Sequence, residues 1–144
     1  MGAILAAAGV EDGLEYAIAN QFMRGLSKTE FQTIFDSDDM LGTFGAKIKM
    51  GHAFRVYGDT TQADHNCIKD IRNVFAHAKM KLDFSHSLVI DACKQLQGPH
   101  GPGTEDKTLW PAYQRFMKCA EYLYLEFLDV ATRTVPDRKE PSLL

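Results

Sequence analysis

The chain has 144 residues, of which 45% are hydrophobic and 24% are charged, and its formal net charge is −3. This length fits one domain with a core large enough to need no disulfide or metal. The slightly acidic balance argues against general electrostatic binding of nucleic acid, which is typical of basic chains, although a local basic patch is compatible with it.

The three cysteines are an odd number, and all fall at helical positions beside apolar residues: Cys67, Cys93 and Cys119. We therefore expect buried thiols in a reducing compartment and not a disulfide framework. No cysteine and histidine spacing has the form of a zinc site, so we predict no metal and no cofactor.

The first ten residues are small and apolar, but they lack a basic start, and Glu11 and Asp12 interrupt the apolar run. A signal peptide needs the basic start, and a membrane span needs about 20 apolar residues. We expect neither of them and no membrane partner, and a cytoplasmic protein follows as the default.

The first predicted helix covers residues 2–24. The apolar residues that share one of its faces are Ile4, Ala8, Ile18 and Phe22, and by angle Glu11 and Glu15 fall in the same face. A carboxylate in an apolar face is costly unless it is paired. We expect a structural ion pair between these acids and Arg72; alternatively, the helix lies near a rim and both acids reach water.

Capping signals mark the next two helices. Ser27 and Glu30 have the spacing of a capping box, which predicts a helix ending at Phe35. The acidic turn at residues 36–39 could hold a cation loosely, but it lacks the glycine and distal glutamate of an EF-hand loop. A third helix is expected over residues 43–57, and its apolar residues on two sides indicate neighbours on both sides.

The chain beyond residue 78 begins with an alternating, extended link. Ser85 or Ser87 then caps a helix to Leu96, and the Gly/Pro-rich segment 98–103 breaks the chain. A last long helix is expected over residues 109–132, with aromatic residues more typical of a core or dimer interface than of a cofactor site. The total predicts an all-α, single-domain bundle of five to six helices at residues 1–133, followed by a flexible tail at 134–144.

The most distinctive prediction is the helix from Asp59 or Thr60 to His77. Its expected core face consists of Cys67, Ile68, Ile71, Val74, Phe75 and Ala78. The opposite side carries a polar row, spaced i, i+4, i+7 and i+11: Asn66, Asp70, Asn73 and His77. Because short polar side chains offer directional donors and acceptors, we predict that this polar row is a binding or subunit-interface surface.

Arg72, Asn73 and His77 also allow a catalytic interpretation. A guanidinium and an imidazole in one site could cleave RNA, with His77 moving a proton and Arg72 stabilising the developing phosphorane charge. Residues five apart on a helix point about 140° away from each other. The two could share a site only if the helix ends near His77 or a second protomer supplies one of them.

Three segments, in order along the chain, resemble the mannitol operon repressor (MltR) family: VEDGLE at residues 10–15, GTFGAKIKM at 42–50 and IRNVFAH at 71–77. The resemblance implies an all-helical, dimeric bacterial regulator of transcription. Members lack a recognised DNA-binding motif, so the resemblance implies regulation through protein partners. It does not extend to the Gly/Pro-rich loop or the tail.

Arg72-Asn73 and His77 also resemble the R-x4-6-H signature of HEPN domains. These domains are helical and dimeric; many are metal-independent ribonucleases and some are inactive binding modules. The sequence therefore favours a non-enzymatic, homodimeric regulator of MltR type, with an endoribonuclease as the alternative. Whether nucleic acid binds stays open.

Overall fold

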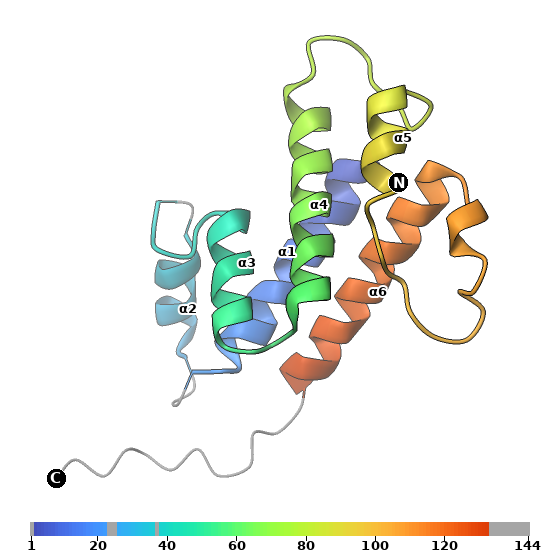
Figure 1. The fold of residues 1–144 in the computed structure, drawn as a ribbon. Coiled ribbons are helices and arrows are strands. Elements are labelled where there is room, and N and C mark those ends of the chain that lie inside the picture. The colour runs from blue at the N-terminus through green and yellow to red at the C-terminus, as the bar shows by residue number, and fades with distance from the viewer. Residues whose placement is uncertain (1, 23–25, 37, 133–144) are drawn as a thin grey trace, which may run out of the picture.

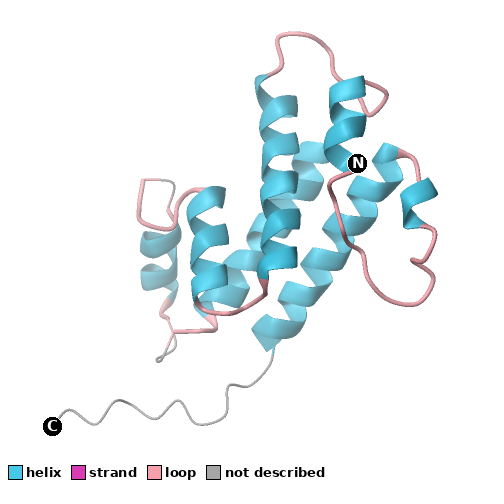
Figure 2. Ribbon diagram, in the orientation of Figure 1, coloured by secondary structure: helices cyan, strands magenta, loops and turns pink. Residues whose placement is uncertain are grey.

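Six α-helices and one 3₁₀ turn form the regular structure of the computed structural model, which describes residues 2–22, 26–36 and 38–132 (Figures 1 and 2). The helices are α1 (Ala3–Ala19), α2 (Lys28–Phe35), α3 (Phe44–Ala53), α4 (Asp59–His77), α5 (Ser87–Cys93) and α6 (Ala112–Thr132), and the 3₁₀ turn is Lys107–Leu109. The described residues contain no strand, so the predicted all-α bundle is confirmed. The predicted tail at 134–144 lies outside the described residues.

Helices α1 and α4 hold the bundle together. Helix α1 packs against α3, α4 and α6, and α4 packs against α1, α3, α5 and α6. Helices α1 and α6 approach closely because small residues face α6; a Cβ added at Gly13 would lie 3.2 Å from Cδ2 of Tyr124. At their carboxyl ends, the Asn20 side chain donates to the carbonyl of Val130 at 3.0 Å. The two helices therefore run in the same direction.

Local capping explains where several helices begin. The Ser27 hydroxyl accepts from the N–H of Glu30 at 3.1 Å, and the Glu30 carboxylate accepts from the N–H of Ser27, so the predicted capping box is confirmed. Thr43 caps α3 through the N–H of Ala46. Each cap satisfies an N–H that the first turn of a helix leaves unpaired.

Several predicted boundaries were wrong. Helix α3 ends at Ala53 and not at residue 57, because the chain turns through Arg55 with a φ of 57°. Helix α5 is capped by His86 and by neither serine, since Asp83 accepts from both the N–H and the hydroxyl of Ser85. Helix α1 ends at Ala19, and the expected end at residue 24 lies outside the described residues.

The buried faces also differ from the prediction. Ile4 in α1 is 49% exposed and Val74 in α4 is 47% exposed, although both were expected in the core. In α4 the buried residues are Asp64, His65, Ile68 and Ile71. The α4 core face therefore runs along Asp64, Ile68 and Ile71, with His65 beside them, and Val74 lies outside it. Among the described helices, none has the length and apolar character needed to cross a bilayer.

Candidate functional site

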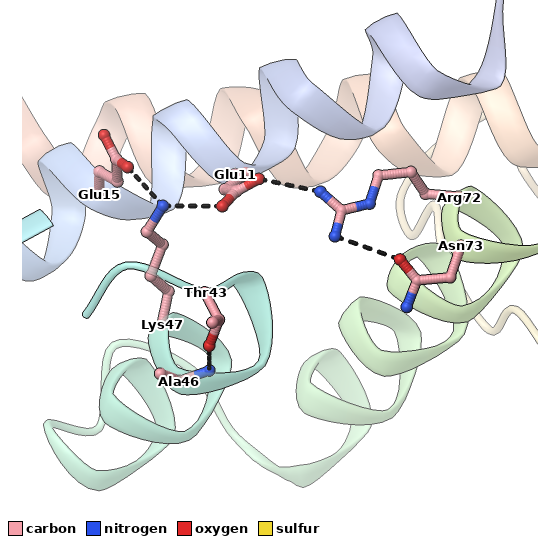
Figure 3. Close-up of polar contacts among 7 residues, drawn as sticks. All are labelled: Glu11, Glu15, Thr43, Ala46, Lys47, Arg72 and Asn73. Carbon is pink, nitrogen blue, oxygen red and sulfur yellow. Dashed lines mark hydrogen bonds and ion pairs between the residues drawn. The ribbon is translucent and has the colours of Figure 1, made fainter. Parts of the chain in front are cut away.

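Four charged side chains form a cluster between α1, α3 and α4 (Figure 3). The Lys47 ammonium lies 2.7 Å from Oε1 of Glu11 and 2.5 Å from Oε1 of Glu15. The other carboxylate oxygen of Glu11 lies 3.1 Å from Nη1 of Arg72. We call Glu11, Glu15, Lys47 and Arg72 the ion cluster. It joins three helices through one continuous row of alternating charges.

Lys47 is the most enclosed member of the ion cluster, with 3% of the residue exposed. Burial by itself lowers the pKa of this ammonium, but hydrogen bonds and the charges of Glu11 and Glu15 outweigh it, and the pKa is raised. Lys47 therefore stays charged at neutral pH. The side chains of the two acids are 17% and 18% exposed, so neither depends on water alone for solvation.

The sequence prediction assigned both acids to Arg72 and missed Lys47. The structure places Arg72 against Glu11, whereas the cation beside Glu15 is Lys47. A signal for Lys47 was present, because it follows Phe44 by three residues and precedes Ile48, inside the apolar part of α3. A cation at such a position needs a buried acid, and α1 offers two.

The Arg72 guanidinium is largely occupied. Besides the contact with Glu11, its Nη2 donates to Oδ1 of Asn73 at 3.3 Å, and its centre lies 5.1 Å from the centroid of the Phe44 ring. These contacts fix the plane of the guanidinium beside α1 and α3. Arg72 keeps 25% of its side chain exposed.

The residues of the polar row have different environments. Asn66 and Asn73 are half-buried, whereas Asp70 and His77 are exposed. Asp70 lies 3.7 Å from the Lys69 ammonium, and Asn73 accepts from Arg72. Among the described residues, no hydrogen bond or ion pair joins His77 to Arg72. The structure thus brings Asn73 to Arg72 and leaves His77 apart, and the row's role as an interface stays a prediction.

Two buried polar residues of α4 were missed by the sequence prediction. The Asp64 carboxylate accepts the backbone N–H groups of Gln97 and Gly98 at 2.7 and 2.8 Å, which anchors the start of the Gly/Pro-rich loop. His65 is fully buried, and neither ring nitrogen has a hydrogen-bond partner. Asp64 and His65 precede Ile68 by four and three residues, so they lie on the same side of the helix. Their helical spacing from Ile68 could have identified both as buried.

An aromatic cage surrounds His65. Its ring stacks on Phe127 with centroids 4.7 Å apart and meets Tyr57 edge-on at the same distance. Burial lowers the pKa of His65 to about 3, so the imidazole is neutral at physiological pH. Because both nitrogens are enclosed, His65 is a packing residue and not a proton carrier in this conformation.

The cysteines are unreactive thiols. All three are free, with Cys93 and Cys119 buried and Cys67 half-buried. Burial raises the pKa of Cys67 to about 12 and that of Cys93 to about 11, so both stay protonated at neutral pH. Within the described ranges, no group of three or more His, Cys, Asp or Glu residues is placed to hold a metal ion.

An apolar groove of about 690 Å³ runs between α1 and α6. We call it the α1/α6 groove. Small residues of both helices line it, and the large side chains in its lining include Leu5, Tyr16, Met117, Tyr124 and Leu128. The charged residues along it are Asp12, Lys118 and Glu121. In α1, Glu11 and Glu15 point away from this groove, toward α3 and α4.

Comparisons of the chain with protein-family models, with curated proteins and with solved structures find no match.

Proposed function

We propose that this chain is a non-enzymatic, all-α interaction domain that works as a homodimer in transcriptional regulation. The three ordered segments that resemble the MltR family support the regulatory role. The observation that carries the proposal is the α1/α6 groove. It is an apolar surface between α1 and α6, the two helices that pack most extensively against each other. Soluble monomers rarely leave a continuous apolar surface of this kind open to water.

The exposed apolar residues beside the groove support a second copy as its occupant. Leu5 is 61% exposed, Tyr16 57% and Leu125 55%. A standard interface buries roughly 800 Å² on each partner, so a dimer would also cover the surface of α1 and α6 beyond the groove.

The charges at the groove also suit a two-fold interface. Such an interface must be complementary to itself, because the same surface occurs on both subunits. Lys118 supplies a positive charge, and Asp12 and Glu121 supply negative ones. In a dimer, Lys118 of one copy can therefore face an acid of the other copy.

The dimer is tested by the mass of the protein in solution. Leu5→Glu puts a charge into the groove at an exposed helical position, so it should leave the fold intact and weaken association at least tenfold. Leu88→Glu is the matched control, because Leu88 is 70% exposed on α5 and does not line the groove. Sedimentation of the three proteins should show dimers for the wild type and Leu88→Glu only.

The regulatory role needs a cellular measurement. Cells from which the gene for this protein has been deleted should have altered transcript levels. Expression of the wild-type protein should restore the original levels, and expression of Leu5→Glu should not. Full restoration by a variant that sediments as a monomer would separate regulation from dimerisation. An unchanged transcript profile would contradict the regulatory proposal itself.

The alternative function, a HEPN-type endoribonuclease, has its own support in the partial exposure of Arg72 and the open position of His77. One of the two conditions for a shared site is met, because α4 ends at His77; the other route is a dimer in which the polar rows of two copies face each other. Incubation with single-stranded RNA decides this alternative. Cleavage should disappear in His77→Ala; cleavage that persists in this variant indicates a contaminant.

A further inference from the structure

A second pocket, of about 290 Å³, opens between α5 and the amino-terminal end of α6. Figure 1 shows these two helices beside each other, with the loop that contains the 3₁₀ turn next to them. The residues that line the pocket include Ile90, Cys93, Lys94, Thr108, Trp110 and Arg115. The pocket is separate from the α1/α6 groove, with which it shares no residue.

Arg115 is the unusual member of this set, because it is a buried cation that has no counter-charge among the described residues. Only 8% of the residue is exposed. Its Nη2 donates to the carbonyl of Leu96, and its Nε is enclosed without any hydrogen-bond partner. Across residues 2–22, 26–36 and 38–132, no carboxylate forms an ion pair with it. Burying a charge is unfavourable unless a partner compensates it.

The other buried charged groups show how the rest of the fold meets this requirement. Lys47 has two carboxylates, and the Asp64 carboxylate accepts two backbone N–H groups. Arg115 has one neutral carbonyl. A guanidinium offers five donors in a planar fork that matches a carboxylate or phosphate. A carboxylate or a phosphate group would therefore suit Arg115 as a partner.

The remaining surroundings of the pocket also favour an anion. Lys94 is a second cation in the lining; its ammonium lies 3.8 Å from Oδ1 of Asp91, and no aspartate or glutamate lines the pocket itself. Ala112, the first residue of the 21-residue helix α6, is part of the lining, so the positive end of that helix dipole faces the pocket. Thr108 adds a hydroxyl, and Trp110 and Ile90 add apolar surface.

We propose that this pocket binds a small organic anion, whose carboxylate or phosphate group pairs with Arg115 and whose apolar part lies against Trp110 and Ile90. The volume of about 290 Å³ is at the small end of ligand sites, which excludes large cofactors. The site is independent of the proposed dimer and of the regulatory role.

Trp110 gives a direct measurement of binding, because it is the only tryptophan in the chain. Its indole N–H produces one signal in a ¹H–¹⁵N spectrum. We would titrate the full chain with benzoate, with inorganic phosphate and with neutral benzamide, keeping ionic strength constant with sodium chloride. At least one of the two anions should shift the signal in a saturable manner, and benzamide should not. The anion that saturates at the lower concentration identifies the preferred head group.

Variants test whether the guanidinium is responsible. Arg115→Met should weaken binding of the anion about tenfold or more, since a charge-assisted pair is lost. Lys49→Met is the matched control, because Lys49 is exposed on α3 and lies outside the pocket, and it should bind as the wild type does. If Arg115→Met does not fold, Lys94→Met replaces it; Lys94 is exposed, and its loss should weaken binding about threefold.

The proposal is overturned by any of three results. The first is the absence of a saturable shift with both anions. The second is a shift with benzamide equal to that with benzoate, which would indicate apolar binding only. The third is wild-type affinity in Arg115→Met or, where that variant is unfolded, in Lys94→Met.

Discussion

Replacing Lys47 with methionine tests whether the ion cluster stabilises the fold. The change keeps most of the side-chain volume but leaves Glu15 without its cation and Glu11 with Arg72 alone. Breaking a buried ion pair by removing one partner destabilises a protein by about 3–5 kcal/mol. Because the two acids are 17% and 18% exposed, water relieves part of this loss, and we expect about 3 kcal/mol.

Urea unfolding, followed by circular dichroism, measures this loss. With an m-value of about 2 kcal/mol per molar, the midpoint of Lys47→Met should fall by about 1.5 M. The control Lys49→Met changes an exposed lysine on the same helix and should stay within about 0.5 kcal/mol of the wild type. Adding Glu15→Gln to Lys47→Met removes a stranded charge and should recover part of the loss.

A loss below about 1 kcal/mol in Lys47→Met would refute this reasoning, because exposed pairs have values of that size. Failure of Glu15→Gln to recover any stability would show that the loss comes from packing and not from stranded charge.

The remaining predictions concern three other positions. Arg72→Ala should lower the free energy of unfolding by about 1–2 kcal/mol in the same urea assay, less than Lys47→Met, because Arg72 is one-quarter exposed and Glu11 keeps Lys47; a larger loss than that of Lys47→Met would reverse this ranking. The unfolded chain protonates His65 below pH 6.5, but the folded chain does so only near pH 3, so stability falls as pH drops through this window by about 1 kcal/mol per unit. His65→Phe should lose less stability than the wild type between pH 7 and pH 5, and equal losses would contradict this cause. Gly51→Ala should lower the thermal midpoint, since the added Cβ would lie 2.8 Å from Tyr57, at a penalty of about 1–3 kcal/mol; an unchanged midpoint would show that Tyr57 moves freely.

Local signals in the sequence were sufficient for the fold class and for several helix starts. The Ser27 capping box depends on residues three apart, so it can be recognised without knowing the rest of the structure. The need of Glu11 and Glu15 for a cation also follows from their own helix. Which cation pairs with each acid depends on how three helices cross. The sequence pattern could therefore not show that Lys47, and not Arg72, pairs with Glu15.

The residues that the sequence prediction missed also depend on how the helices pack against each other. Periodicity identified an apolar face on α4, but it could not fix how the helix is turned toward the core; Val74 is exposed and His65 is fully buried. Arg115 lies among aromatic residues of α6, and its isolation becomes visible only when the neighbouring carbonyls and side chains are placed. Buried polar groups are thus the part of the site that sequence patterns predict least well.

The most direct test of the proposed function locates the contact between two copies of the chain. In a mixture of isotope-labelled and unlabelled protein, a filtered nuclear Overhauser experiment detects only contacts between protomers. We predict contacts from Leu5, Tyr124 and Leu125 at the α1/α6 groove. Contacts confined to Asn73 and His77, or a protein that remains a 16.1 kDa monomer at all concentrations, would contradict the proposal.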